Sequence, residues 1–284
     1  MALRRFAPAK LNLYLHVIGR RADGYHLLDS LVAFVEVGDE IIAAPAPSLS
    51  LAVTGPHAAA LADTPQDNLV RRAAERLAAA VGRPAAVALT LVKNLPVASG
   101  IGGGSSDAAA TLKALAELWR LDIGAADLVA LAASLGADVP VCLAGRAAWL
   151  AGVGEQIEPA AALPTATVLL VNPGVALPTA AVFAARRGPF SAPARFALPA
   201  DAAGLARLLA ERRNDLTAPA IEKVPVIGRM LDQLAAVEGA LIARMSGSGA
   251  TCFALFALPE AAAAAAARLA AEQPDWWVAT GRLF

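Results

Sequence analysis

The residues best suited to chemistry are the glycines and serines of Ser99-Gly-Ile-Gly-Gly-Gly-Ser-Ser-Asp107. Glycine has no Cβ atom, so this backbone can approach a ligand closely and can adopt positive φ angles. An apolar strand pattern precedes the segment and a helical pattern follows it, and the free N–H groups of a helix N-terminus bind anions. We therefore predict a phosphate-binding loop, with a flexible glycine turn before a capped helix as the alternative.

Several well-known motifs do not account for this segment. A Walker A loop needs Lys followed by Ser or Thr, and a dinucleotide-binding fingerprint needs a third glycine where Ser105 stands. The His-Arg-Asp and Asp-Phe-Gly triplets of protein kinases are absent, as is the Gly-x-Ser-x-Gly elbow of serine hydrolases. Ser105, Ser106 and Asp107 could cap the following helix or offer oxygen atoms to a phosphate or a metal ion.

A second glycine-serine loop, Ser246–Ala250, lies between two apolar strand patterns. A tight hairpin needs only two turn residues, and this loop has two glycines and two hydroxyls. An ordinary hairpin loop is one interpretation. The other is a loop whose amides, together with the Ser246 or Ser248 hydroxyl, face a phosphate group.

Two charged residues stand out because the chain has few of their kind. Its 24 basic residues are 20 Arg and only four Lys, and one of these lysines, Lys10, lies inside the alternating segment Phe6–Arg20. Asp138 follows Gly136 among apolar neighbours. Lys10 is either a placed charge or a lysine that snorkels from an edge strand to solvent. Asp138 is either a helix cap or a buried acid kept for catalysis.

The apolar periodicity predicts the elements that position these groups. In Phe6–Arg20, leucines alternate with Lys10, Asn12, Tyr14 and His16, which predicts a strand with one apolar and one polar face. Turn and cap residues bound the other elements. The further predicted strands are Leu27–Val37, ending at Gly38-Asp39, then Ile41–Ala44, Leu49–Thr54, Val87–Val92, a hairpin from Arg146–Leu150 through Gly152, Val168–Val171, Ala240–Met245, Thr251–Phe256 and Trp277–Thr280.

Helices are predicted where apolar residues recur every three to four positions. One follows a cap at Asp67 or Asn68 and ends at Gly82. The others are Ala108–Leu118, Ala125–Leu135, and helical segments within Ala180–Arg187, Ala202–Arg213, Val226–Val237 and Ala261–Ala271. We predict an α+β fold of two domains, residues 1–158 and 159–284, the second with the β-α-β-β-α-β order of a split-βαβ sandwich.

Composition excludes several classes of protein. The 284 residues carry 24 basic and 24 acidic side chains, and 57% of them are hydrophobic, too many for a disordered chain. Unclustered charge argues against nucleic acid or an anionic membrane as partner. The longest uncharged stretches, 41–62 and 160–185, are broken by Pro and Gly, so we expect no membrane span. Cys142 and Cys252 have no metal-ligand spacing, which favours a reducing cytoplasm and two buried thiols.

Three segments in chain order carry a resemblance to a known family. Pro8-Ala-Lys-Leu-Asn-Leu13, Pro96–Asp107 and Ser246-Gly-Ser-Gly-Ala-Thr251 resemble the three motifs of the GHMP small-molecule kinases. Arg20-Arg-Ala-Asp-Gly-Tyr-His26 and Gly136-Ala-Asp-Val-Pro140 are the more specific pieces. They resemble the members that phosphorylate the 2-hydroxyl of 4-diphosphocytidyl-2-C-methyl-D-erythritol in non-mevalonate isoprenoid precursor biosynthesis. The similarity extends from about residue 5 to about residue 255.

The resemblance implies a two-domain GHMP kinase architecture, with an N-terminal α/β nucleotide-binding domain and a C-terminal ferredoxin-like (split-βαβ) domain that binds substrate. It also implies ATP and Mg²⁺ as cofactors, although no carboxylate cluster in the sequence identifies metal ligands. Asp138 would accept the proton of the substrate hydroxyl, and Lys10 would stabilise the ionised acid and the transferring phosphoryl group. The nucleotide would contact Asn68, Lys93, Pro96, Gly100, Gly102, Gly103, Gly104, Ser105 and Ser106.

On the substrate side, the resemblance implies a cytosine stacked on Tyr25 and read by the hydrogen bonds of His26, with Asn12 nearby. Phe183 matches the opposite aromatic wall, or packs in a helix core instead. Gly247, Ser248 and Gly249 would contact the substrate phosphates.

The expected partner is this small molecule, in a cytoplasmic monomer or weak homodimer. The alternatives are a homoserine- or mevalonate-type kinase and a non-catalytic nucleotide-binding module. The joint presence of Lys10 and Asp138 argues against the module, because a pure binder gains little from a carboxylate beside a triphosphate.

Overall fold

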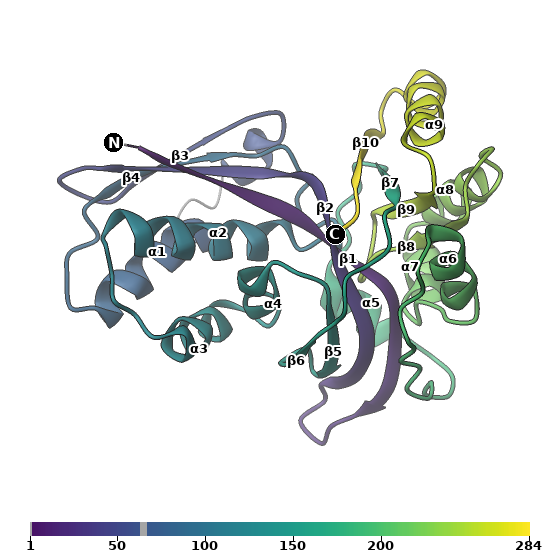
Figure 1. Cartoon of the computed structure of the whole chain (residues 1–284), viewed down its shortest axis with the longest axis horizontal. Helices are drawn as coiled ribbons and strands as arrows, with labels where there is room; N and C mark the ends of the chain where they lie inside the picture. Colours follow the sequence, from purple (N-terminus) through teal and green to yellow (C-terminus); the bar gives the residue numbers. More distant parts are fainter. Residues whose placement is uncertain (1, 63–66) are drawn as a thin grey trace. The chain divides into compact units, whose positions relative to one another are not determined.

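The computed structural model of the chain describes residues 2–62 and 67–284, whose contacts form two compact units. Unit 1 comprises Met1–Ala9, Gly38–Val97 and Gly102–Gly145; unit 2 comprises Lys10–Val37, Ala98–Ile101 and Arg146–Phe284. The units interleave in sequence because strands β1 (Leu3–Arg20) and β2 (His26–Pro45) contribute residues to both (Figure 1). The domain boundary at residues 158 and 159 stays a prediction.

Unit 1 packs helices against a small sheet. The last residues of β2 pair antiparallel with β4 (Val87–Val92), and β3 (Ser50–Thr54) pairs parallel with β4. Helices α1 and α2 lie along one face of these strands (Figure 1). The 3.6-residue period of α1 places Val70, Ala73 and Leu77 on its buried face. The helices of this unit are η1 (Ala58–Leu61), α1 (Leu69–Ala80), α2 (Gly103–Leu118), α3 (Ala125–Leu135) and α4 (Val139–Ala144).

Unit 2 contains an antiparallel sheet in the order β10-β7-β9-β8. Numbered along this half of the chain, that order is 4-1-3-2, so the predicted split-βαβ arrangement is confirmed. The strands are β7 (Thr167–Asn172), β8 (Ile242–Met245), β9 (Cys252–Phe256) and β10 (Trp277–Arg282). The first residues of β2 pair with β5 (Ala148–Gly152), which forms a hairpin with β6 (Gln156–Pro159). The helices are α5 (Thr179–Ala185), α6 (Ala202–Ala210), α7 (Thr217–Lys223), α8 (Val226–Ala235) and α9 (Pro259–Glu272).

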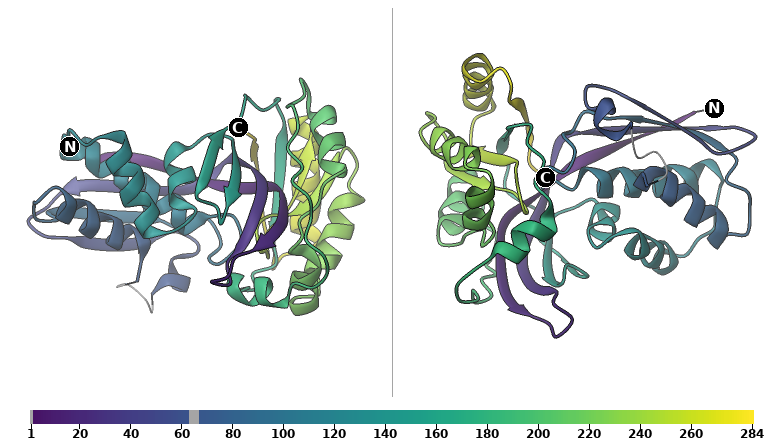
Figure 2. Two further views of the ribbon diagram at one scale, coloured as in Figure 1. Left: turned by 90° about the horizontal axis from the view of Figure 1, so that it is seen from below. Right: turned by 180° about the vertical axis from the view of Figure 1, so that it is seen from behind.

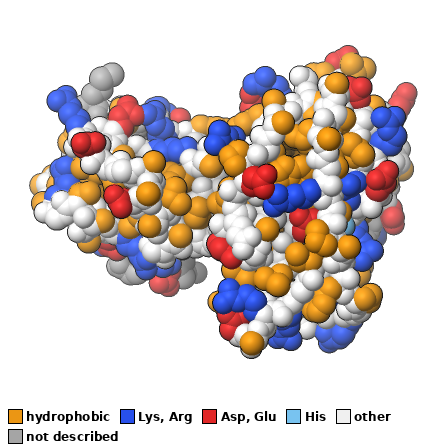
Figure 3. Space-filling view, turned by 60° about the horizontal axis from the view of Figure 1, so that its bottom comes forward, with side chains coloured by type: hydrophobic (Ala, Val, Ile, Leu, Met, Phe, Trp, Pro, Cys, Tyr) orange, Lys and Arg blue, Asp and Glu red, His pale blue; other side chains and the backbone are white. Residues whose placement is uncertain are grey.

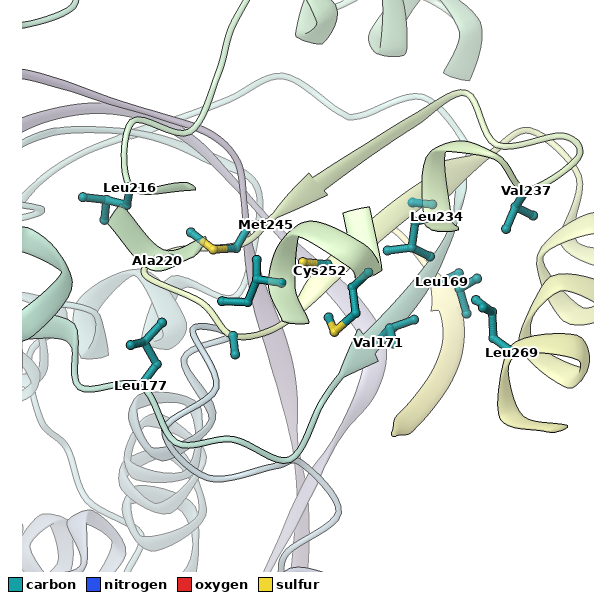
Figure 4. Close-up of a cluster of buried hydrophobic side chains, with 14 of the residues drawn as sticks. Leu169, Val171, Leu177, Leu216, Ala220, Leu234, Val237, Met245, Cys252 and Leu269 are labelled. Atoms are coloured by element: carbon teal, nitrogen blue, oxygen red, sulfur yellow. The ribbon is translucent and has the colours of Figure 1, made fainter. Parts of the chain in front are cut away.

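One hydrophobic cluster holds the second sheet to its helices. Helices α8 and α9 pack against the same face (Figure 2), and Leu234 and Leu269 from these helices meet Leu169 and Val171 from β7 (Figure 4). Cys252 belongs to this cluster, and burial raises the pKa of its thiol. Cys142 and Cys252 are both buried, which confirms their predicted place as small buried residues.

Two predicted boundaries are wrong for physical reasons. Gly38-Asp39 does not end a strand, and Ile41–Ala44 is not a separate one, because β2 continues to Pro45. A Cβ atom at Gly38 would overlap the Ala7 carbonyl, so this glycine permits close strand contact rather than a turn. Helix α2 begins at Gly103 rather than Ala108, since Gly102 caps it in the left-handed region with φ of 64°.

Basic and acidic side chains are interspersed on the face drawn in Figure 3. Among the described residues, no helix is both long enough and apolar enough to cross a membrane.

Candidate active site

The N-terminus of α2 gives unit 1 an anion-binding feature. Helix geometry leaves the amides of Gly103, Gly104 and Ser105 without intrahelical acceptors, whereas the Ser106 amide already donates to the Gly102 carbonyl at 2.9 Å. Gly104 is exposed and Ser105 is half-buried, so this turn is accessible. Capping by Ser105, Ser106 or Asp107 is wrong, because all three residues lie inside the helix. The hydroxyls of Ser105 and Ser106 remain predicted phosphate ligands, together with the free amides of Gly103, Gly104 and Ser105.

A buried charge cluster lies next to this turn. Lys93 Nζ donates to Asp39 Oδ2 at 2.5 Å and to Asp107 Oδ2 at 2.8 Å. All three side chains are at most 3% exposed. Burial opposes the charged ammonium, but the carboxylates of Asp107 and Asp39 outweigh it and raise the pKa of Lys93. Lys93 was predicted as a nucleotide contact from its place in the sequence; its ammonium is held by these two acids.

Two other predicted residues of unit 1, Asn68 and Asp138, lie at the starts of helices. Asn68 caps α1, as predicted, through its Oδ1 atom, which accepts from the Val70 amide at 2.9 Å. Asp138 precedes α4, a short helix that the sequence patterns did not predict. Asp138 thus stands at the N-cap position of α4, but its half-buried side chain makes no capping hydrogen bond there. Pro96 is buried in the loop after β4.

In unit 2, Lys10 and Asn12 lie on the polar face of β1. Lys10 is 3% exposed, so it is not a lysine that snorkels to solvent. Its Nζ lies 3.5 Å from Asn12 Oδ1, and Asn12 Nδ2 donates to Ser30 Oγ at 2.9 Å. Ser30 Oγ in turn donates to the Tyr14 carbonyl at 2.5 Å. The alternation of β1 therefore places Lys10 and Asn12 on the same face of the strand, as the sequence predicts, and both side chains are buried there.

Ser246 connects three motifs that are far apart in sequence. Its fully buried hydroxyl accepts from the Asn12 amide at 3.2 Å and donates to the Gly100 carbonyl at 3.0 Å. The Lys10 amide donates to the Ile101 carbonyl at 2.9 Å, and the Thr251 amide to the Ser99 carbonyl at 3.0 Å. The hydroxyl of Ser246 is therefore engaged inside the protein, which contradicts its predicted contact with a phosphate. It fixes the lysine-bearing strand and both glycine loops together.

The two loops interlock because both have glycine at the contact. A Cβ atom at Gly100 would lie 2.6 Å from the carbonyl oxygens of Gly249 and Ser246, and one at Gly247 would lie 2.7 Å from the Gly100 oxygen. Gly100, Gly247 and Gly249 all have positive φ. Strands β8 and β9 pair antiparallel on either side of Ser246–Ala250, so the loop joins a hairpin, as one interpretation predicted, and it also contacts the first glycine loop.

Two further asparagines support the second loop and were missed from the sequence. Asn214 Nδ2 donates to the carbonyls of Met245 and Gly247 at 2.8 and 2.7 Å. Asn172 Nδ2 donates to Thr251 Oγ1 at 2.9 Å. Both residues contact loop positions at least 31 residues away in sequence, so no local spacing could have indicated them.

Aromatic residues gather where the resemblance places the substrate base. His26 and Phe183 stack with ring centroids 5.1 Å apart and an interplanar angle of 27°. Tyr25, the preceding residue, is 65% exposed. Partial burial, with the charges of Arg20 and Arg186, lowers the pKa of His26. Thr179, in the helix that carries Phe183, hydrogen-bonds Ser248 Oγ at 2.8 Å, so Phe183 and the second glycine loop are positioned together.

The predicted residues thus form two groups, one in each unit. Unit 2 brings together Lys10, Asn12, Gly100, Tyr25, His26, Phe183, Gly247, Ser248 and Gly249. Unit 1 contains Asn68, Lys93, Pro96, Gly102, Gly103, Gly104, Ser105, Ser106 and Asp138. The pairing of Lys10 with Asp138 stays a prediction.

Comparison with known proteins gives consistent matches. Residues 68–146 match the family model of the GHMP kinases N terminal domain, and residues 197–275 match that of the GHMP kinases C terminal. The chain is 55% identical to the 4-diphosphocytidyl-2-C-methyl-D-erythritol kinase of Paramagnetospirillum magneticum, over 98% of this chain and 97% of that protein. It is 56% identical to the kinase of the same name from Cereibacter sphaeroides, over 98% of both. A crystal structure of 4-(cytidine 5'-diphospho)-2C-methyl-D-erythritol kinase superimposes with a TM-score of 0.80 at 37% identity, over 99% of both chains.

Proposed function

The chain belongs to the GHMP kinase family, and on that premise we propose that it phosphorylates the 2-hydroxyl of 4-diphosphocytidyl-2-C-methyl-D-erythritol, with ATP as the phosphate donor. The reaction would supply isoprenoid precursors by the non-mevalonate route. The observation that carries this proposal is the near full-length identity of 55% and 56% to kinases named for that substrate. The residues of both units fit the reaction, as follows.

ATP would bind with its phosphates at the N-terminus of α2. The free amides of Gly103, Gly104 and Ser105 supply hydrogen-bond donors, and the helix dipole adds a favourable potential for anions. Backbone groups therefore bind the triphosphate, which explains why a chain with a formal charge of zero can take a strongly anionic ligand. Asn68 and Pro96 remain candidate contacts of the nucleoside.

Phosphoryl transfer depends mainly on in-line positioning and on neutralised charge. Asp138 would accept the proton of the acceptor hydroxyl as the oxygen attacks the γ-phosphate. Lys10 would stabilise the carboxylate and the charge on the transferring group. The burial of Lys10 suits this role, because a charge in a water-poor environment interacts more strongly than one in bulk water.

Mg²⁺ would accompany ATP and be held mainly by the phosphate oxygens. In residues 2–62 and 67–284, no group of three or more His, Cys, Asp and Glu side chains could hold a metal ion. Mg²⁺ often keeps several waters and takes only one or two protein ligands beside the substrate phosphates. The carboxylates next to the α2 turn, Asp39 and Asp107, are engaged by Lys93. We therefore assign no protein ligand to the metal.

The acceptor would bind through its cytosine and its phosphates. Phe183 and the exposed ring of Tyr25 offer aromatic faces, and the neutral imidazole favoured by the lowered pKa of His26 can both donate and accept a hydrogen bond. Gly247, Ser248 and Gly249 would face the phosphates of the acceptor. The two buried thiols suit a reducing cytoplasm, and we propose a monomer or weak homodimer there.

The test is an ADP-release assay of the purified chain with three acceptors, 4-diphosphocytidyl-2-C-methyl-D-erythritol, homoserine and mevalonate. We expect kcat/KM for the cytidine-containing acceptor to exceed the others by at least about 10³-fold, because a site that pairs with polar substrate groups rejects acceptors that lack them. Preferred turnover of homoserine or mevalonate would assign the chain to another branch of the family. ATP binding without transfer to any acceptor would indicate a non-catalytic module.

A further inference from the structure

Lys93 and two acidic side chains of unit 1, Asp39 and Asp107, are buried together, each at most 3% exposed. Lys93 donates to one carboxylate oxygen of Asp39 and to one of Asp107, and these side chains come from the loop after β4, from β2 and from α2. Burying charged groups costs several kcal/mol each unless they are paired. Such a cluster therefore fixes the relative positions of the elements that carry it, even where it adds little net stability.

The cluster lies directly against the first turn of α2. A Cβ atom built on Gly103, the first residue of the helix, would lie 3.1 Å from Lys93 Nζ and 3.6 Å from Asp39 Oδ2. Asp107 follows one turn later on the same helix. The Lys93 ammonium therefore lies next to the backbone of Gly103 and donates a hydrogen bond to Asp107, four residues further along the helix. Gly104, between these two positions, stays exposed.

The two carboxylates differ in how firmly they are held. Asp39 Oδ1 accepts from the amides of Asn94 and Leu95 at 2.6 and 2.8 Å, so both of its oxygens are engaged. Asp107 Oδ1 is buried and has no hydrogen-bond partner among the described residues. Asp107 is thus bound to the rest of the cluster only through its other oxygen, and its link to Lys93 can be altered without disturbing the amides at Asp39.

We propose that Lys93 and Asp107 are positioning residues for the nucleotide: their contact holds the first turn of α2 where its free amides meet the ATP phosphates. This inference rests on the proposed function. In it, Lys93 acts on the nucleotide indirectly, by holding the backbone of the first turn of α2. Lys93 supports the backbone donors, and the neighbouring acids neutralise its charge.

The experiment compares three variants by calorimetric titration with a non-hydrolysable ATP analogue and by steady-state kinetics. Asp107→Ala removes the link to Lys93, and Asp107→Asn keeps an oxygen that can accept from it. Thr111→Val is the matched control, because Thr111 is buried in the same helix and its Oγ1 donates to the Asp107 carbonyl at 2.8 Å, so the change lowers stability without breaking the link.

We expect Asp107→Ala to weaken binding of the analogue and to raise the KM for ATP by at least about tenfold, because small displacements of positioned groups cost this much or more. The KM for the acceptor should not change. Asp107→Asn should restore binding to within about threefold of the wild type, and Thr111→Val should bind normally. If Asp107→Ala does not fold, Asp107→Ser replaces it, since its hydroxyl is too short to reach Lys93.

Unchanged binding in Asp107→Ala, or an equal loss in Thr111→Val, would overturn the proposal and leave the cluster a purely structural one. These results are distinct from a failure of the proposed function. If the proposed function fails, the wild type will either not bind the ATP analogue or bind it and phosphorylate none of the three acceptors. In the second case, comparing the variants with the wild type still tests whether the contact between Lys93 and Asp107 supports binding of the analogue.

Discussion

Gly100→Ala tests the contact between the two glycine loops of unit 2. Gly100 has φ of +75°, and a Cβ atom there would lie 2.6 Å from two carbonyl oxygens and 2.8 Å from the Gly249 nitrogen. A non-glycine residue in this backbone region costs about 1–2 kcal/mol. The overlap adds to this cost, because backbone atoms must move by several tenths of an ångström, and forced overpacking typically costs about 1–3 kcal/mol. We expect a total loss of about 2–5 kcal/mol in the free energy of unfolding.

Gly188→Ala is the matched control. Gly188 also belongs to unit 2 and has φ of +85°, but a Cβ atom there meets nothing within 4 Å. It should therefore lose only the backbone cost of about 1–2 kcal/mol. Urea denaturation of both variants measures the difference, and ADP release should show at least about 10²-fold lower kcat/KM for Gly100→Ala alone. Equal stability losses, or normal turnover in Gly100→Ala, would refute the interlocking of the loops as a requirement of the site.

Four further predictions concern single side chains. Asp138→Ala should lower kcat by at least about 10³-fold while calorimetry finds unchanged affinity for the ATP analogue; residual turnover near the wild-type rate would remove the base assignment. Tyr25→Ala should weaken acceptor binding by about 1–3 kcal/mol with Tyr25→Phe nearly normal, and an equal loss in both would argue against stacking. Ser246→Ala should lower the free energy of unfolding by about 1–3 kcal/mol, measured in urea, because it leaves the Asn12 amide without this acceptor. Burial, with the nearby Asp39, raises the pKa of Asp107 to about 8 against the opposing Lys93 ammonium, so near neutral pH Asp107 accepts the hydrogen bond from Lys93 largely as the protonated acid. The native state therefore holds this proton to higher pH than the unfolded chain, and the free energy of unfolding in urea should fall from about pH 4 to pH 8, a slope that Asp107→Asn should reduce.

Periodicity predicted elements whose two faces differ in side-chain type. The 3.6-residue spacing of α1 marks the one face that meets a core, whereas the alternation of β1 separates apolar from polar side chains on two faces that are both buried over Ala9–Val17. The continuation of β2 through Gly38 could not be predicted in this way, because glycine and aspartate next to each other usually mark a turn. Here Gly38 is required by a neighbouring strand, and the Asp39 side chain binds amides 55 and 56 residues away.

Part of the candidate site followed from residue type, and part did not. Lys10 and Asn12 were predicted as placed polar groups because they interrupt an apolar chain, and the structure confirms that both are buried on β1. Asn214 and Ser246 act through partners more than 30 residues away, so only the folded chain shows what they hold. A motif resemblance points to candidate ligand-binding residues, but it does not reveal the long-range hydrogen bonds that hold those residues in place.

The glycines between Ser99 and Ser105 differ in role on either side of the point where the chain passes from unit 2 to unit 1. Gly100 packs against the second glycine loop, and the later glycines form the start of α2. Ile101 belongs to unit 2 and Gly102 to unit 1. Before this point, Gly100 is needed because backbone atoms of the second loop occupy the space of a side chain. After it, Gly102 supplies a left-handed cap, and a side chain on Gly103 would press on the Lys93 ammonium. At Gly104 an added Cβ atom would meet only one leucine methyl group, at 3.6 Å, so we expect a side chain there to obstruct the ATP phosphates rather than the fold. Replacing these glycines one at a time should thus separate loss of stability, at Gly100, from loss of nucleotide affinity alone, at Gly104.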